Sequence, residues 1–185
     1  MNNINDFLIK DGFLFEYLGK DEIVEIPKSV NVIGYQVFKD KLHIKEVIFH
    51  DSIYKIDDEA FYGCESLTFK KLPKKLKVIG KYAFAKCNNL KTVVIPLGVT
   101  EINFGVFFEC KNLERVILPR NLKRIGCCAF ADCEKMIDLY IPKNVTYIDW
   151  YAFCGCNTLE EVMLPKKVKF IGEGAFPLNI NIEKY

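Results

Sequence analysis

Five regularly spaced cysteines pose the first question of chemistry in this chain. Each follows a phenylalanine by three positions and is separated from the next by 23 residues. They are Cys64, Cys87, Cys110, Cys133 and Cys156. Such a row is compatible with a disulfide framework, a metal site, or small apolar groups that fill a core. Three more cysteines, Cys127, Cys128 and Cys154, lie outside the row.

Geometry and spacing favour buried, reduced thiols for the row. Side chains that repeat once per structural unit point in parallel, whereas a disulfide needs two Cβ atoms about 3.8 Å apart that face each other. Zinc sites often contain Cys-x-x-Cys, a spacing that this sequence lacks. We therefore expect five core thiols and no metal. At the other three positions we expect incidental small residues, with a reactive or metal-binding pair as the alternative.

Residues for catalysis are scarce. The two histidines, His43 and His50, belong to no recognisable Ser-His-Asp or Cys-His arrangement, and no glycine-rich phosphate loop occurs. We expect both histidines to be solvated surface residues. The sequence predicts a protein that is not an enzyme and that carries no cofactor.

The spacing of 23 residues organises nearly the whole chain. It relates seven phenylalanines, seven isoleucines and six prolines without insertion or deletion, and only His50 breaks the proline series. Each isoleucine is followed by Gly, Asp or Asn, residues that tolerate left-handed or turn backbone. The phenylalanines are Phe38, Phe61, Phe84, Phe107, Phe130, Phe153 and Phe176.

One unit suggests two short strands and a turn. In "LKTVVIP", Val93 and Ile95 lie on one face of a strand that Pro96 ends. Val99 and Ile102 follow as a second extended piece, and the next segment places Val106 and Phe107 within about one helical turn. A unit this short cannot bury its apolar residues alone, so stacked units must cover each other. The fold class is therefore a β-rich α/β solenoid of about seven coils with short parallel strands and short helical turns, on the order of 30 to 35 Å long.

The two ends of a solenoid must be closed. The segment "FLIKDGFLF" predicts a hairpin around Asp11-Gly12 that covers the first coil. We expect a single domain, 1–185, with an N-terminal cap at 1–22, the repeats at 23–176 and a partial last coil at 177–185. The last coil has Asn179 at the cysteine position and ends before its strand would be complete. That end is either a minimal cap or an assembly surface.

The unit from Leu90 to Asn112 resembles the repeat of the BspA-like leucine-rich-repeat family, and the resemblance spans about residues 23–185. It implies a right-handed solenoid that acts in recognition, at the cell surface or secreted, in adhesion or host interaction. The N-terminus lacks an uninterrupted apolar signal region, and thiol-rich cores also suit the cytoplasm. The family has no catalytic motif to carry over.

Composition narrows the possible partners. The chain has 26 basic and 24 acidic residues, interspersed along the sequence without a basic stripe, so we expect no nucleic acid partner. It has no apolar run long enough to span a membrane, so we expect no membrane insertion. A protein partner remains, with the chain as a monomer or a weak end-to-end oligomer.

The outward side of the first predicted strand is the candidate binding face. One column of this face is mostly apolar, and a second column, two residues earlier in each coil, is mixed. From the first column we take Ile48, Val94, Ile117, Tyr140 and Met163, and from the second Phe69, Arg115, Asp138 and Glu161. The alternative is that β-branched residues simply suit strands.

A second group of aromatic residues is a weaker binding candidate. It consists of Tyr54, Tyr147, Trp150, Tyr151 and Phe170. Aromatic side chains dominate binding hot spots, although a chain this rich in them must expose some. Our leading hypothesis is a non-enzymatic protein-recognition module. The alternative is an intracellular scaffold that stacks through its solenoid ends.

Overall fold

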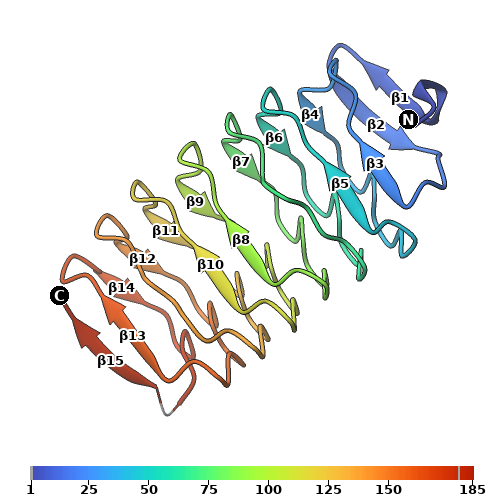
Figure 1. The fold of residues 1–185 in the computed structure, drawn as a ribbon. Helices are drawn as coiled ribbons and strands as arrows, with labels where there is room; N and C mark the ends of the chain where they lie inside the picture. The colour runs from blue at the N-terminus through green and yellow to red at the C-terminus, as the bar shows by residue number, and fades with distance from the viewer. Residues whose placement is uncertain (1, 179) are drawn as a thin grey trace.

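The computed structural model describes residues 2–178 and 180–185 and is an elongated solenoid of about seven coils (Figure 1). Each coil contributes a strand or an isolated bridge to the first of two rows and a strand to the second, as the period predicts. Among the described residues the sole helix is the short 3-10 helix Ile4–Asp6. The segments expected to be helical turns are successive hydrogen-bonded turns, in which, for example, Cys87 N donates to Phe84 O at 3.3 Å.

The first row of strands carries the candidate binding face. Its strands pair in parallel, and isolated bridges at Thr68, Asp138 and Tyr140 continue it where a coil has no full strand. The strands are β3 (Ile23–Glu25), β5 (Glu46–Ile48), β8 (Thr92–Val94), β10 (Arg115–Ile117), β13 (Glu161–Leu164) and β15 (Asn181–Lys184).

The second row is also parallel and lies across the core from the first. Proline, or His50, ends each strand of the first row before the chain turns into the second. Its strands are β4 (Val32–Ile33), β6 (Lys55–Ile56), β7 (Val78–Ile79), β9 (Glu101–Ile102), β11 (Arg124–Ile125), β12 (Tyr147–Ile148) and β14 (Phe170–Ile171).

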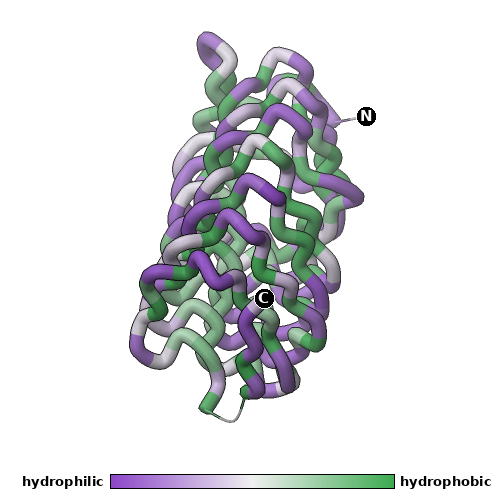
Figure 2. The backbone as a smooth tube through the Cα atoms, turned by 90° about the vertical axis from the view of Figure 1, so that its left-hand side faces the viewer, coloured by the Kyte–Doolittle hydropathy of each residue, from purple (hydrophilic) through white to green (hydrophobic). Residues whose placement is uncertain are grey.

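A stack of phenylalanine rings runs through the core between the two rows. Neighbouring rings, from Phe38 to Phe176, lie 4.9 to 5.7 Å apart between centroids and within 9° of parallel. The inward residues of both rows are buried around this stack, including Val93, Ile95, Val99 and Ile102. Figure 2 views the coils from the C-terminal side and shows hydrophobic and hydrophilic residues alternating along each coil. The repeated apolar pattern therefore becomes one continuous core.

The five regularly spaced cysteines lie in this core, as predicted. All five are free and fully buried. Each Sγ donates to a phenylalanine carbonyl of the preceding coil, for example Cys87 to Phe61 O at 3.2 Å and Cys110 to Phe84 O at 3.1 Å. Burial raises the pKa of Cys64 and of Cys110 to about 12, so these thiols stay protonated.

Left-handed backbone is not the reason for the glycine that follows the repeated isoleucine. The left-handed backbone occurs two residues later, at positions such as Glu59 (φ 54°) and Tyr82 (φ 54°). At Gly80 itself, a Cβ would lie 2.3 Å from Asp58 N in the preceding coil. Glycine is needed there because the two coils approach closely. This position alternates strictly along the chain between glycine and Asp or Asn.

The N-terminal hairpin caps the first coil, as predicted. β1 (Phe7–Lys10) and β2 (Phe13–Tyr17) pair antiparallel, and β2 continues the second row by pairing with β4. The Tyr17 ring lies 5.3 Å from Phe38 and covers the end of the stack. The Asn2 side chain accepts from Glu25 N at 2.6 Å and donates to Ile23 O at 2.8 Å, so it caps the outer edge of β3.

The expectation that the last coil ends before its strand is complete is wrong. β15 pairs in parallel with β13, with Glu161 opposite Asn181. These partners are 181 − 161 = 20 residues apart, so a shorter coil brings the strand into register before Tyr185. Asn179, which replaces the cysteine, lies outside the described residues.

The expectation of no basic stripe is also wrong. The corners between the two rows form a line of loops beside β7, β9, β11 and β12 (Figure 1). In these corners basic residues greatly outnumber acidic ones, as in Lys74, Lys75 and Lys77 of one coil or Lys166, Lys167 and Lys169 of another. Eight lysines and no acidic residue lie between Glu65 and Glu101, and the 23-residue period places cations from distant segments on the same edge. No helix in the described part of the chain has the length and apolar character of a membrane span.

Candidate functional site

Alternation along the first row separates an inward from an outward set of side chains. The inward residues Val47, Val93, Val116, Leu139 and Val162 are buried. The outward apolar residues form a column across the strands, which we call the apolar column. It comprises Ile48, Val94, Ile117 and Tyr140, with 41%, 53%, 49% and 57% of their surface exposed, and the half-buried Met163.

The register of the strands sets the neighbours in this column. Ile117 lies directly opposite Val94 in the pairing of β10 with β8, and Tyr140 lies opposite Met163. Adjacent parallel strands are about 4.8 Å apart, so these side chains are in contact range of one another. The structure thus brings the predicted apolar residues of coils four to seven into one continuous strip.

The polar column beside it contains three charged residues from the prediction. Arg115, Asp138 and Glu161 are exposed at the start of the strand position in successive coils. Arg115 Nε lies 3.4 Å from Asp138 Oδ2, and both side chains are more than half exposed. An exposed ion pair of this kind is weak, so both groups remain available to a partner.

Phe69 does not lie on the outward face, and its predicted placement is wrong. Its ring lies 5.7 Å from Phe49 and 5.5 Å from Phe84 and packs against the core. The reason is a one-residue shift in register: Thr68, not Phe69, is the partner of Glu46. Lys70 then points to solvent, with 88% of its side chain exposed. The sequence did contain this signal, because "LTFKKLP" has lysine where other coils have valine or leucine.

The C-terminal residue adds a contact that the sequence did not reveal. Tyr185 Oη donates to Ile141 O at 2.8 Å and lies in hydrogen-bonding range of Tyr140 Oη at 2.7 Å, and the two rings are 5.7 Å apart. Burial and the bond to Tyr140 raise the pKa of Tyr185 to about 12. Tyr185 therefore reaches across the coil of Met163 and forms the C-terminal limit of the apolar column.

The second aromatic group is brought together only in part. Tyr147 stacks on Phe170 at 4.3 Å, and Trp150 meets Phe170 edge-on at 6.0 Å. The Arg124 guanidinium covers the other side of Tyr147 at 4.7 Å, and Arg124 also binds the buried carboxylate of Asp149 at 2.7 Å. Tyr54 lies on β6's corner, four coils from Tyr147. Tyr147 and Phe170 thus cover each other, whereas Tyr54, Trp150 and Tyr151 stay about half exposed.

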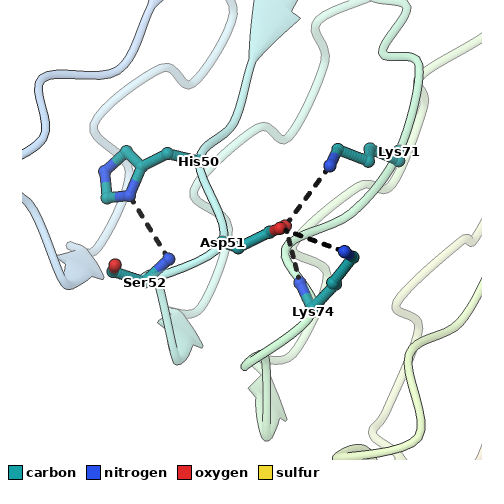
Figure 3. Close-up of polar contacts among 5 residues, drawn as sticks. All are labelled: His50, Asp51, Ser52, Lys71 and Lys74. Carbon is teal, nitrogen blue, oxygen red and sulfur yellow. Dashed lines mark hydrogen bonds and ion pairs between the residues drawn. The ribbon is translucent and has the colours of Figure 1, made fainter.

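His50 is buried, contrary to the expectation of a solvated residue. Figure 3 shows the contact between its ring and Ser52. Its Nδ1 accepts from Ser52 N at 3.3 Å, so its Nε2 carries the proton and donates to Pro27 O at 3.0 Å. Burial lowers the pKa of His50. The ring is held as a neutral structural group at the one corner without proline. His43 is exposed, as expected.

The three cysteines outside the core row are half-buried near one another. Cys127 Sγ and Cys128 Sγ are 3.5 Å apart. Burial and the contact with Cys127 raise the pKa of Cys128 to about 12, which disfavours a reactive thiolate. Within residues 2–178 and 180–185, no cluster of three or more His, Cys, Asp or Glu side chains is arranged to hold a metal ion.

The repeats match a known family over nearly the whole chain. The model of the BspA type leucine-rich-repeat region matches residues 11–137 and 79–185 in 6 copies. The chain belongs to the BspA-type leucine-rich-repeat family. Leucine-rich repeats of this kind indicate a protein-interaction module, and such repeat proteins are generally non-enzymatic scaffolds. The curated proteins include no match to this BspA-type chain.

Solved structures share the fold of this BspA-type protein. The leucine-rich-repeat protein of Treponema pallidum is 30% identical, with a TM-score of 0.86 over 96% of this chain and 91% of that one. A leucine-rich-repeat protein from Eubacterium ventriosum is 26% identical, with a TM-score of 0.83 over 95% of this chain and 48% of that one. A leucine-rich cell surface protein from Faecalibacterium prausnitzii, 23% identical, has a TM-score of 0.52 over 99% of this chain and 73% of its own.

Proposed function

We propose that this protein is a non-enzymatic recognition module that binds another protein through the apolar column of its first strand row. The observation that carries this proposal is the continuous exposed strip from Val94 to Tyr140. Apolar side chains that gather on a rigid surface favour association, because partner contact removes them from water. The proposed contact residues are Ile48, Val94, Ile117, Tyr140 and Met163, and Phe69 is left out because it packs inward.

The charged residues beside the column supply specificity in this proposal. Arg115, Asp138 and Glu161 line one side of the apolar strip and leave a polar rim around it. Protein interfaces commonly have an apolar centre and a polar rim, and charges at the rim steer the partner and fix its orientation. From the family resemblance we further propose that the partner is a host protein met at the cell surface.

The test compares two aspartate variants. Val94→Asp/Ile117→Asp places two charges at opposed positions in the middle of the strip, and Leu42→Asp places one charge on an apolar residue outside both strand rows that is 58% exposed. Immobilised wild-type protein and both variants are used to capture proteins from an extract, with far-UV circular dichroism as the check on folding. We expect the captured proteins to be lost with Val94→Asp/Ile117→Asp and kept with Leu42→Asp. Equal capture by all three would overturn the assignment of this face.

The second candidate function is a scaffold that assembles through the solenoid ends. The four residues of β15 are exposed, and one edge of this strand pairs with β13. Its other edge pairs with no strand in the described part of the chain. An exposed strand edge is a template for pairing with another chain. Sedimentation velocity over a wide concentration range tests this candidate: assembly predicts a sedimentation coefficient that rises with concentration, and a constant monomer value argues against it.

A further inference from the structure

The corners between the two strand rows carry a strong excess of positive charge. Each corner consists of the five residues that follow the repeated proline or His50, which gives the ranges 28–32, 51–55, 74–78, 97–101, 120–124, 143–147 and 166–170. These 35 residues contain 12 basic and 2 acidic ones, Asp51 and Glu101, a net charge of +10. The whole chain has +2, so the remaining residues sum to 2 − 10 = −8. The charge is therefore segregated, and we call this line of corners the basic edge.

The fold places these corners in one straight line. Lys77 N donates to Tyr54 O at 2.9 Å, Lys123 N to Thr100 O at 2.9 Å, and Lys169 N to Thr146 O at 2.8 Å. Each bond joins equivalent residues of neighbouring coils, so the corners are stacked at the strand spacing of about 4.8 Å. Seven corners at that spacing give an edge of about 30 Å, along which the line of loops is visible in Figure 1.

Most of these cations have no internal partner. Eleven of the twelve basic residues are exposed and Lys55 is half-buried. Within the part of the chain that the structure describes, only three of their side-chain cations have a carboxylate within 4.0 Å: Lys55 with Asp57, Lys74 with Asp51, and Arg124 with Glu101 and Asp149. Figure 3 shows that Asp51 is shared between Lys74 and Lys71. The remaining nine are Lys28, Lys75, Lys77, Arg120, Lys123, Lys143, Lys166, Lys167 and Lys169.

We infer that the basic edge binds a linear acidic polysaccharide, a chain of sugars that carry sulfate or carboxylate groups. Charge complementarity over about 30 Å favours an extended anionic polymer, because a straight row of cations matches a row of anions. The exposed hydroxyls of Ser29, Ser52 and Thr100 lie among the cations and suit hydrogen bonding to sugar hydroxyls. The basic edge is distinct from the apolar column and would bind a different partner.

Nucleic acid fits the edge less well. Single-stranded nucleic acid is held by aromatic rings that stack on bases between the cations. The corners contain three aromatic residues, and two of them, Tyr147 and Phe170, stack on each other at 4.3 Å. Ten of the 12 basic residues are lysines, which act as point charges and do not select between phosphate, sulfate and carboxylate. The shortage of free aromatic rings is therefore what disfavours nucleic acid.

The test measures the binding of heparin to two triple variants that lose the same charge. Lys166→Gln/Lys167→Gln/Lys169→Gln removes three cations from the basic edge, and Lys81→Gln/Lys91→Gln/Lys135→Gln removes three exposed cations outside it. Calorimetric titration is run at several NaCl concentrations, with circular dichroism to check the fold. We expect the edge variant to bind heparin about tenfold more weakly and the control within about twofold of wild type. Each lost cation–anion contact lowers the magnitude of the slope of log affinity against log salt by roughly 0.7. Three lost contacts should therefore lower it by about 2 for the edge variant.

Three results would overturn the inference. The first is an equal loss of heparin affinity in both triple variants, which would assign binding to net charge alone. The second is equally tight binding of poly(dT), which would make the edge a nucleic-acid site. The third is equally tight binding of vesicles made of phosphatidylcholine and phosphatidylserine, which would make it a membrane-contact site.

Discussion

Replacement of Gly80 by alanine is the sharpest probe of how closely the coils stack. A Cβ at this position would lie 2.3 Å from Asp58 N and 2.4 Å from Asp57 C, both in the backbone of the preceding coil. Ordinary contact begins at 3.4 Å, so the coils must separate locally by 3.4 − 2.3 = 1.1 Å. No flexible side chain can move aside to relieve these backbone contacts. The backbone of Gly80 is not left-handed, so the added methyl group tests the contact alone.

The expected cost follows from the contacts that the shift disturbs. Gly80 N donates to Ile56 O at 2.8 Å, and a shift of this size stretches that bond beyond hydrogen-bonding range. Overpacking costs about 1–3 kcal/mol and a lost backbone bond about 1 kcal/mol. Alanine recovers up to about 1 kcal/mol by restricting the unfolded chain. We expect a net loss of roughly 1–4 kcal/mol, or a melting temperature lower by about 2–16 °C.

Two matched variants control this experiment. Gly126→Ala meets its nearest atom, Ile102 O, at 2.8 Å, so it needs a smaller shift than Gly80→Ala. Asn103 occupies the same position in the next coil and already carries a Cβ, so Asn103→Ala introduces no new backbone contact. It loses only the hydrogen bond from Asn103 Nδ2 to Ile79 O, worth about 1 kcal/mol. Urea unfolding followed by circular dichroism should rank Gly80→Ala as the least stable, then Gly126→Ala. If Gly80→Ala unfolds at the same urea concentration as wild type, the reasoning about close coil approach is refuted.

Three other perturbations test the core and the buried histidine. Phe107→Ala leaves a cavity between the rings of Phe84 and Phe130 and should lower the free energy of unfolding in urea by about 3–5 kcal/mol. The control Leu97→Ala, at an exposed corner, should change it by less than about 0.5 kcal/mol. Ellman's reagent should label no more than three of the eight cysteines in the native protein and all eight in denaturant, since five are fully buried; rapid native labelling of more than three would contradict the core assignment. Because burial lowers the pKa of His50, its contribution to stability is complete above about pH 6.5, the value in the unfolded chain, and is lost as the pH falls from there through the lowered pKa of the folded state. Wild type should therefore lose more stability than His50→Gln between about pH 7.5 and pH 5, and parallel pH profiles would contradict this.

Much of the core was predictable because its signal is periodic. Phe84, Cys87, Val93 and Ile102 recur at one spacing, and equal spacing forces equal environments once the units stack. The N-terminal hairpin was predictable because Asp11-Gly12 is a local turn signal. The core depends on contacts between equivalent residues of adjacent coils, and the sequence repeats those residues at a constant spacing.

The candidate face was predictable only where the register is regular. Val94 and Ile117 face outward because their strands follow the alternation of the consensus unit. Phe69 turns inward because the core of its coil gains more from an aromatic ring than from Lys70, and the strand shifts by one residue to allow it. Tyr185 meets Tyr140 because a last coil of 20 residues, instead of 23, brings the C-terminus back onto the face.

By itself, the sequence determined the number of coils, the buried phenylalanines and cysteines, and the family of this protein. Each of these follows from the 23-residue repeat, since apolar residues at a constant interval can be buried only by stacking. The tertiary structure alone decided the inward turn of Phe69, the closure of the last coil and the gathering of cations on the basic edge. Those features depend on the register between strands and on which side of a coil each residue occupies. Charges such as Arg120, Lys143 and Lys166 are far apart in the chain, but they become neighbours because each coil advances by only about 4.8 Å.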